Sequence, residues 1–395
     1  MKDEKTINGN DNSITIKCDG LLQDEYTVEG NYEGFKFGPE LEFFVVDKVT
    51  FKPKNCLDEL AGLSDFGKLI KPELAAEQIE IIAPPSESIR DLEEALTYTA
   101  REVVNKLDEV NACLLPISLF DTAEFTITPE PRYQLLIDTL GPDFRKNAVL
   151  VASDQINIGA SNELEAFNIF GDVRYLLPIL MGLSASSPFK KGKENGTASN
   201  RMDVYDAAIN EYPNLTGIPP RIGGLEDYAK HLENLPVFQH PNMFYKYARP
   251  MPHRGVAVEI RCIDKQPTIE DYLALVALSK AFIKGTKLYI ELLQDTYFSP
   301  PTKEMDPLFR ITRGEDNYIE GEFNRARIRG IADPEHYKNI IASSSLGPEE
   351  GKYLEPLYDR IENGSLADNM IKLKKEHGLE ISYRIIAQNF VDSLK

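Results

Sequence analysis

The sequence predicts a fold of mixed helices and strands, with a β-sheet that has one polar face. Four strand-like segments each carry two polar side chains at alternating positions, with apolar side chains between them. Longer segments show the apolar spacing of amphipathic helices. If the four segments lie in one sheet, its polar face gathers carboxylate and amide oxygens, which hard divalent cations prefer as ligands.

The segment Val256–Asp264 gives the clearest example of this pattern. Val258 and Ile260 are apolar, and Glu259 and Arg261 alternate with them. Because successive side chains of a strand point to opposite faces, Glu259 and Arg261 share one face. A solvent-exposed strand would show the same alternation, so this segment alone leaves a surface strand and a functional strand open.

Three further segments repeat the pattern. Their polar pairs are Glu40 and Glu42, Gln78 and Glu80, and Gln155 and Asn157. Two carboxylates about 4 Å apart, at an effective dielectric constant of roughly 20, repel each other by about 4 kcal/mol. Glu40 and Glu42 therefore need either solvent or a neutralising cation. The apolar run Phe43–Val46 follows them directly, which favours a buried strand and a cation.

The remaining elements follow from apolar spacing and from capping and turn residues. Ile89–Ala112 has helical spacing, and its first turns are acidic, as the helix dipole favours. Thr268 is the expected N-cap of a helix that runs to about Leu293, and Gly141-Pro142 is expected to end an earlier helix. The other expected elements are strands over Phe35–Asp47, Leu74–Ala83, Ala112–Ser118 and Ala148–Gly159, helices over Tyr133–Leu140 and Ala166–Ser187, and further helices at the C-terminal end.

The composition argues against several classes of protein. The chain has 395 residues, enough for a substantial core, and its net charge of −19 argues against binding to nucleic acid or an acidic membrane. Lysines interrupt the apolar segment Tyr272–Leu293, as in a packed helix and not a membrane span. The four cysteines lack C-x-x-C spacing, so zinc and redox motifs are poor explanations. The first residues show no secretory signal. We therefore expect a soluble cytoplasmic protein with small-molecule substrates, and a homo-oligomer stays open.

Two basic segments are candidates for contacts with phosphate oxygens. Lys190–Gly196 is a glycine-containing loop that includes Lys193, and Phe323–Arg329 places arginines, among them Arg325 and Arg327, at every second position. These arginines would face phosphates as one row. A basic surface loop and a surface charge run are the simpler alternatives. Neither the P-loop motif nor the Rossmann motif occurs, so both of those nucleotide-binding folds lack support.

Taken together, these segments resemble the second glutamate–cysteine ligase family. The matching segments are Phe37–Glu42, the serine-rich run Ser184–Phe189 with Gly192 and Arg201 after it, and Val258–Arg261 with Asp264. The similarity extends in order from about Phe35 to Gly330. The members of this family are carboxylate–amine ligases of the glutamine-synthetase-like superfamily.

The resemblance implies an α+β catalytic domain built on a curved antiparallel sheet. This sheet would form a funnel flanked by helices, with ATP entering at one end and the other substrates at the opposite end. We expect a polar N-terminal segment at residues 1–30, the glutamine-synthetase-like domain at 31–335 and a helical extension of the same domain at 336–395.

The resemblance also implies roles for individual residues. The metal-binding glutamates of the family correspond to Glu40, Glu42, Glu80 and Glu259. The H-x-H-V-G segment of the family corresponds to Gln155–Gly159, so this chain has Gln155 and Asn157 in place of the histidines, as the plant-type branch has. Because an amide oxygen is a competent magnesium ligand, Gln155 joins the expected metal ligands.

The remaining expected site residues would bind anionic groups. Arg201 and Arg261 correspond to arginines of the family and are the expected catalytic residues, which would hold the γ-phosphate or a substrate carboxylate. The residues expected to contact ATP are Asn157, Lys193, Arg325 and Arg327.

The activity that the resemblance implies is ATP-dependent joining of the γ-carboxylate of glutamate to an amine. The first candidate for the amine is L-cysteine, the intermediate is an acyl phosphate, and the cofactors are ATP with Mg²⁺ or Mn²⁺. Three alternatives stay open. They are a ligase for glutamate and a different amine, a phosphotransferase that stops at the acyl phosphate, and a non-catalytic family member that binds nucleotide or a partner protein.

Overall fold

A seven-stranded sheet forms the centre of the computed structural model, which describes residues 35–233, 235, 244–251, 256–295, 316–343 and 346–395. Its strands lie in the order β2 (Ile70–Pro72), β3 (Gln78–Ile82), β1 (Phe37–Asp47), β5 (Asp154–Gly159), β9 (Ala257–Ile260) and β8 (Ala248–Met251), and β4 (Ala112–Leu115) also pairs with β1. The expected segment at residues 1–30 lies outside the described residues.

The long strand β1 holds this sheet together. Its start pairs with β5, its middle with β3 and its end with β4. Its aromatic and β-branched residues suit a pleated, buried surface. Every pair of neighbouring strands in the sheet is antiparallel, as the resemblance implied.

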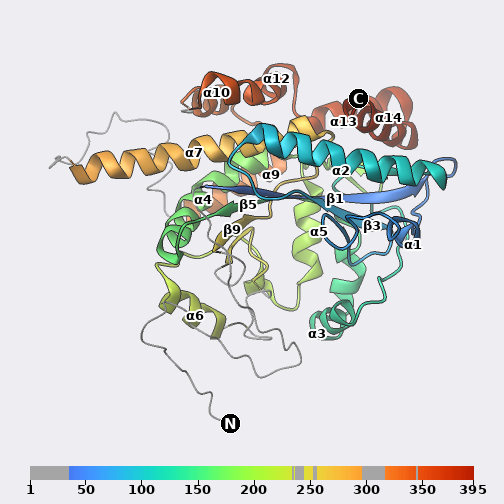
Figure 1. Cartoon of the computed structure of the whole chain (residues 1–395), viewed down its shortest axis with the longest axis horizontal. Coiled ribbons are helices and arrows are strands. Elements are labelled where there is room, and N and C mark those ends of the chain that lie inside the picture. Colours follow the sequence, from blue (N-terminus) through green and yellow to red (C-terminus); the bar gives the residue numbers. More distant parts are fainter. Residues whose placement is uncertain (1–34, 234, 236–243, 252–255, 296–315, 344–345) are drawn as a thin grey trace, which may run out of the picture.

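Helices cover both faces of the sheet (Figure 1). On one side lie α2 (Ile89–Glu109) and α7 (Ile269–Asp295), and on the other side lie α3 (Pro131–Ala148) and α5 (Asn200–Ala208). The apolar face of the sheet points toward the first side, because the ring of Phe43 in β1 lies 5.0 Å from that of Phe390 in α14 (Leu379–Ser393). The polar face therefore points toward α3 and α5.

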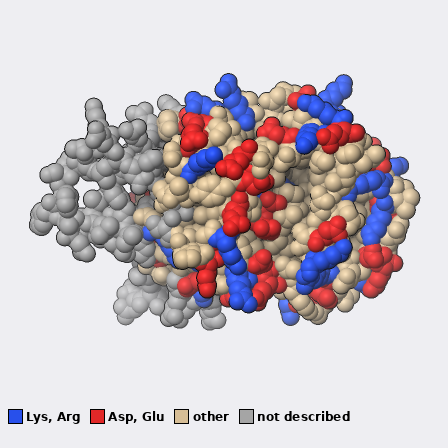
Figure 2. Space-filling model, turned by 90° about the horizontal axis from the view of Figure 1, so that it is seen from above, with Lys and Arg blue, Asp and Glu red and all other residues tan. Residues whose placement is uncertain are grey.

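The C-terminal part of the chain is helical, as expected. Its described helices are α9 (Asp316–Arg329), α10 (Pro334–Ala342), α11 (Pro348–Gly351), η3 (Lys352–Leu354), α12 (Glu355–Asn363), α13 (Leu366–His377) and α14. In Figure 1, α10, α12, α13 and α14 lie beyond α2 and α7, away from the polar face of the sheet. Figure 2 views the molecule from this side and shows acidic and basic side chains close to one another over its surface. This side therefore carries no uniform charge.

The remaining elements complete the described fold. They are α1 (Leu57–Leu60), α4 (Glu163–Ser184), α6 (Leu225–Glu233), η1 (Pro213–Leu215) and the hairpin strands β6 (Phe189–Lys190) and β7 (Lys193–Glu194). By length and composition, α4 alone among the described helices could span a membrane, but 83% of its most apolar window is buried inside the protein. It packs against α7, α9, β8 and β9, so α4 is a core helix.

Local sequence signals explain where the helices begin. Ser88 caps α2 by accepting the N–H of Asp91 at 3.2 Å. The predicted cap of α7 is confirmed, since Thr268 Oγ1 accepts the N–H of Asp271 at 3.1 Å.

The prediction that Gly141-Pro142 ends a helix is confirmed, although a second helical stretch follows at once and the two are counted together as α3. The chain breaks at Gly141, whose φ of 84° is easily adopted only by glycine, but helical structure resumes and continues to Ala148. Pro142 stands in the first turn after the break, where its missing N–H has no helical partner to lose. The resumed turns matter, because they carry part of the pocket wall described below.

Candidate active site

The register of the sheet gathers the expected polar residues on one face. Directly opposite residues of an antiparallel pair point to the same side. The opposed pairs are Glu42 with Glu80, Glu40 with Gln155, and Asn157 with Glu259. The four strands that carry or lead into these polar pairs therefore belong to one sheet, and three direct strand pairings join them.

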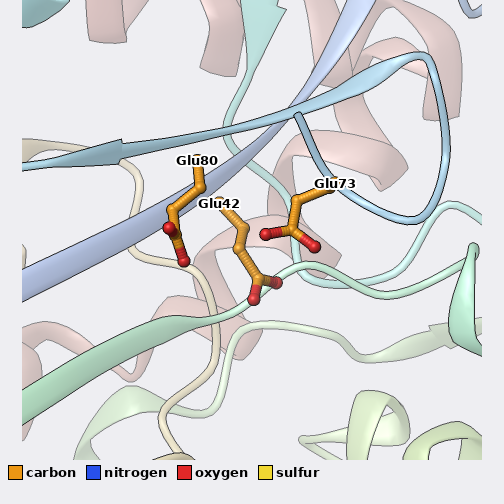
Figure 3. Close-up of side chains that lie close together, drawn as sticks. All are labelled: Glu42, Glu73 and Glu80. Carbon is orange, nitrogen blue, oxygen red and sulfur yellow. The ribbon is translucent and has the colours of Figure 1, made fainter. Parts of the chain in front are cut away.

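Three carboxylates come together on this face. Each of Glu42, Glu73 and Glu80 has a carboxylate oxygen within 4.8 Å of those of the other two, and Figure 3 shows the three side chains pointing toward a common space. Sequence reasoning missed Glu73, because it lies just before the segment expected to be a strand. A turn at Ala76–Glu77 between β2 and β3 brings it beside Glu80. We call these three residues the carboxylate cluster.

The carboxylate cluster lacks enough positive charge around it. Burial raises the pKa of Glu73 to about 8, and the charge of Glu42 adds to this shift. Burial likewise raises the pKa of Glu42 and that of Glu80, and the charge of Glu40 adds to the shift at Glu80. The Nζ atom of Lys71 lies 3.8 Å from Glu80 and offers partial compensation. Such a cluster fits an added divalent cation, since carboxylate oxygens are the ligands that Mg²⁺ and Mn²⁺ prefer.

The two amide residues of β5 support this interpretation. Gln155 Nε2 donates to Glu42 Oε1 at 2.7 Å, which orients that carboxylate, and the N–H of Ser153 donates to its other oxygen at 2.7 Å. Asn157 Nδ2 donates to the carbonyl of Gly38 at 3.1 Å, whereas the buried Oδ1 atom of Asn157 has no hydrogen-bond partner. A buried acceptor without a partner is costly, so a ligand or cation at this face would satisfy it.

Glu40 and Glu259 lie outside the carboxylate cluster, although they share its face. Glu259 is buried and forms ion pairs with Arg249 and with Arg261, whose Nη1 atom lies 3.6 Å away. Glu40 is half-buried near Glu80. The expected metal ligands thus differ in their surroundings. Glu42 and Glu80 lie in the cluster that needs positive charge, whereas Glu259 already has two arginine partners.

A pocket of about 170 Å³ opens beside the cluster. Its polar lining includes Glu42, Glu73, Gln155 and the two arginines expected to be catalytic, Arg201 and Arg261. Its apolar wall comes largely from α3, the residues just after it, α5 and Tyr245. These apolar lining residues include Tyr133, Leu136, Phe144, Ala148, Tyr205, Ala208 and Ile209. One cavity therefore brings together carboxylates, guanidinium groups and aromatic rings.

Neighbouring side chains fix the positions of the two arginines. Arg201 is almost fully buried, and its Nε donates to Asp264 Oδ1 at 2.8 Å. The guanidinium of Arg261 lies 5.6 Å above the ring of Tyr245, and its Nε is buried without a hydrogen-bond partner. Buried guanidinium groups that line a cavity are suited to binding carboxylate or phosphate oxygens.

The other expected ATP contacts are not brought to this pocket. Lys193 is exposed on the β6–β7 hairpin, whose turn residues Lys191 and Gly192 both have positive φ. Arg325 and Arg327 lie on α9, a helix, where every second residue points in a different direction, so the expected row of arginines does not form.

Each of these two arginines has its own partner. Arg325 Nη1 lies 3.1 Å from Glu322 on the same helix, and Arg327 forms an ion pair with Asp203 of α5. A surface charge run, the simpler alternative, describes Arg325 better than a phosphate contact does.

Comparison with known proteins agrees with this fold. The chain is 26% identical over 342 residues to a Trichormus variabilis protein named "Putative glutamate--cysteine ligase 2", covering 84% of this chain and 86% of that relative. The structure of glutamate–cysteine ligase from Francisella tularensis, in complex with AMP, superposes with a TM-score of 0.60 and 14% identity, covering 91% of this chain and 89% of that one.

A second solved structure and a family model complete the comparison. The bifunctional glutathione synthetase of Pasteurella multocida superposes with a TM-score of 0.61 and 15% identity over 91% of this chain, which spans about half (52%) of that longer chain. Both structures confirm the expected fold class. The model of glutamate–cysteine ligase family 2 matches residues 36–382, so the chain belongs to this family.

Proposed function

We propose that the protein is an ATP-dependent ligase that joins the γ-carboxylate of glutamate to an amine, with L-cysteine as the first candidate. Family membership supports an ATP-dependent ligase. The observation that carries the proposal is the pocket, which brings Glu42 and Glu73 of the carboxylate cluster together with Arg201 and Arg261. ATP and glutamate are both anions, and a cation bound to the cluster together with the arginines would neutralise them. We place this activity in the cytoplasm, on small-molecule substrates.

The carboxylate cluster would hold Mg²⁺ or Mn²⁺. Glu42, Glu73 and Glu80 would be its carboxylate ligands, with Glu40 beside them, and the amide oxygen of Gln155 would complete the set, whereas Asn157 would contact ATP. A metal bound there neutralises charge on the triphosphate. Glu259 is already paired with two arginines, so we assign it to orienting Arg261 and not to the metal.

The reaction needs two displacements. The γ-carboxylate of glutamate attacks the γ-phosphorus of ATP and releases ADP, which leaves an acyl phosphate. The amine then attacks the acyl carbon, phosphate leaves, and the nitrogen loses a proton. Arg201 and Arg261 would hold the oxyanions in line for both steps. The chain supplies positions and charges and no nucleophile, and none of the described cysteines (Cys56, Cys113, Cys262) lines the pocket.

A phosphate-release screen tests this proposal. The protein, glutamate and magnesium–ATP are combined with a panel of amino acids and amines. A ligase releases phosphate only when an amine accompanies glutamate. Turnover with glutamate alone would indicate a phosphotransferase, and no turnover with any amine would indicate a non-catalytic binder. Hydroxylamine is a useful member of the panel, because it converts an acyl phosphate to a hydroxamate without needing a fitted acceptor pocket.

An amine other than L-cysteine is the second candidate acceptor, because the pocket has an apolar wall. Rings and aliphatic chains from α3 and α5 face the cavity, among them Phe144, Tyr205 and Ile209. They suit the small apolar side chain of cysteine, and they suit equally an amine with another apolar group. Comparing L-cysteine with L-serine, alanine and 2-aminobutyrate at equal concentration decides between these candidates. A clear preference for L-cysteine over its isosteres supports the first one, and equal rates support the second.

A further inference from the structure

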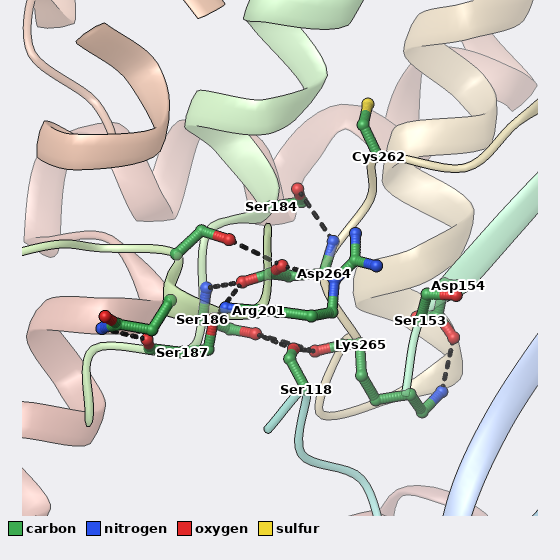
Figure 4. Close-up of polar contacts among 12 residues, drawn as sticks. Ser118, Ser153, Asp154, Ser184, Ser186, Ser187, Arg201, Cys262, Asp264 and Lys265 are labelled. Atoms are coloured by element: carbon green, nitrogen blue, oxygen red, sulfur yellow. Dashed lines mark hydrogen bonds and ion pairs between the residues drawn. The ribbon is translucent and has the colours of Figure 1, made fainter. Parts of the chain in front are cut away.

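A buried carboxylate behind the pocket makes an unusually complete set of hydrogen bonds. Asp264 has no exposed surface, and it lies three positions after Arg261 in the chain. Its four donors are the N–H of Ser186 at 2.9 Å, Ser187 Oγ at 2.8 Å, Ser199 Oγ at 2.9 Å and Arg201 Nε at 2.8 Å. Figure 4 shows Ser186, Ser187 and Arg201 converging on it. Only a carboxylate, with two oxygens, accepts this many donors, since a backbone carbonyl has just one oxygen.

These bonds fix Arg201 at two points. Asp264 holds the guanidinium directly, and Ser187 Oγ, which donates to Asp264, accepts the backbone N–H of Arg201 at 3.0 Å. Arg201 Nη2 in turn donates to the carbonyl of Arg261 at 3.3 Å. The two arginines that line the pocket are therefore linked to each other, and both depend on where Asp264 sits.

The same carboxylate lies next to the strand that supports the carboxylate cluster. Asp264 forms a β-bridge with Ser153, and the N–H of Ser153 donates to Glu42 Oε2 at 2.7 Å. The β-bridge between Ser153 and Asp264 thus connects the cationic side of the pocket, at Arg201, with its anionic side, at Glu42. A shift of Asp264 would move both sides relative to each other.

We propose that Asp264 is a positioning residue that acts through Arg201. It anchors the Nε edge of the guanidinium, so that the remainder of the group is presented to an oxyanion in the pocket, either the γ-phosphate of ATP or a carboxylate of glutamate. This inference rests on the proposed function. The shared chemistry is oxyanion binding, and separate measurements with ATP and with glutamate identify which anion Arg201 holds.

A neighbouring ion pair offers a matched control. Asp154 and Lys265 are as deeply buried as Asp264, with Lys265 Nζ 2.6 Å from Asp154 Oδ1, and the N–H of Gln266 donates to the other oxygen of Asp154 at 2.7 Å. Neither Asp154 nor Lys265 lines the pocket. Replacing Asp154 therefore removes a buried carboxylate of the same region without releasing a pocket arginine.

The experiment compares Asp264→Asn with Asp154→Asn, and places Asp264→Asn in a double-mutant cycle with Arg201→Lys. Both single aspartate variants are expected to melt at a lower temperature. Only Asp264→Asn is expected to raise KM for one of the two anions and to lower kcat/KM about 100-fold, because misplacement of a positioning group costs about that much. Combined with Arg201→Lys, Asp264→Asn should cause little further loss, since both changes act through the same guanidinium.

Several outcomes would overturn the proposal. One is full additivity of Asp264→Asn and Arg201→Lys, and another is an equal change of KM in Asp154→Asn. If Asp264→Asn does not fold, Ser199→Ala and Ser187→Ala replace it, because each removes one hydrogen bond to Asp264 and should raise the same KM by a smaller factor.

Calorimetric binding of glutamate and of magnesium–ATP separates this proposal from the proposed function. If Asp264→Asn binds one of these anions more weakly than the wild-type protein does, and the wild-type protein forms no hydroxamate, the proposed ligase activity fails and the positioning role stands. If the wild-type protein binds neither anion, the positioning role fails as well.

Discussion

Two groups of carboxylates lie at and behind the pocket of this protein, and they differ in how their negative charge is compensated. In the carboxylate cluster, Glu42, Glu73 and Glu80 face one another. Burial raises the pKa of all three, and repulsion by neighbouring carboxylates adds to the shifts at Glu73 and Glu80. Behind the pocket, Asp264 and Asp154 each have one buried cation and further hydrogen bonds. The first group needs an external cation, whereas the second is complete within the chain.

This difference separates binding from support. A carboxylate that already has its cation and its donors has no oxygen left to offer a ligand, so it serves to fix its neighbours. Carboxylates that share too little positive charge are unstable together and gain from a metal. The predictions below test this division, beginning with the largest expected effect.

Removing one ligand of the cluster should abolish activity. Glu42→Gln keeps the size of the side chain but removes the charge that would bind the metal, so phosphate release should fall below detection while the circular dichroism spectrum is unchanged. Glu94→Gln is the control, because Glu94 is an exposed partner of Arg90 on α2. Normal turnover in Glu42→Gln would remove this residue from the metal site.

Changing the shape of a pocket cation, at constant charge, should have the next largest effect. Arg261→Lys keeps the positive charge beside Glu259 but loses the planar fork that binds an oxyanion through two N–H groups. We expect kcat/KM to fall about 100-fold. The exposed pair partner Arg90 provides the control, as Arg90→Lys should not change the rate. An unaffected rate in Arg261→Lys would contradict the role assigned to Arg261.

The cluster should respond to metal without any substrate. Mg²⁺ or Mn²⁺ is expected to raise the melting temperature of the wild-type protein, since a ligand at about 100 times its Kd stabilises the folded state by about 2.7 kcal/mol. Glu73→Gln and Glu80→Gln should lose most of this shift, whereas Asp154→Asn, from the second group, should keep it. Equal shifts in all variants would show that the cation binds elsewhere.

The pH dependence of stability should report the raised pKa of Glu73 in the metal-free protein. The pKa of Glu73 is raised from 4.5 to about 8, so the folded state holds a proton that the unfolded state has released between these values. Stability is therefore expected to fall as pH rises from about 4.5 to about 8. Glu73→Gln should flatten this part of the denaturation profile, and so should saturating Mg²⁺. A profile unchanged by either would disprove the raised pKa.

The smallest effect is expected for the cysteines. Cys56 and Cys262 are buried, Cys113 is half-buried, and burial raises the pKa of each thiol. A triple change to alanine should lower the melting temperature but leave kcat/KM unchanged in the folded fraction. Loss of activity in a folded protein would require a thiol in the mechanism, against the proposal made here.

Much of the site could be predicted because strand alternation is a local property. Glu40 and Glu42, or Gln155 and Asn157, must share a face once their segments are extended, whatever the rest of the chain does. The helix caps Ser88 and Thr268 are equally local. Asp264 was also visible in the sequence, but only as part of a resemblance, without a role.

Other parts of the site depend on contacts between distant segments. Glu73 reaches the cluster because a turn reverses the chain between it and Glu80. The two residues are an odd number of positions apart, so strand alternation alone would have placed Glu73 on the opposite face from Glu80. Arg325 and Arg327 showed the spacing of a strand in a segment that folds as a helix.

The sequence by itself determined the family, the polar face of the sheet and most of its oxygen-bearing residues. Only the tertiary structure decided which carboxylates share a space and which are paired with cations. Glu259 and Glu42 look alike in the sequence, but β8 brings Arg249 opposite the first, and a turn brings Glu73 beside the second. The physical reason is that side-chain direction is set residue by residue, whereas the charge around a buried carboxylate is set by whichever strands and turns pack next to it.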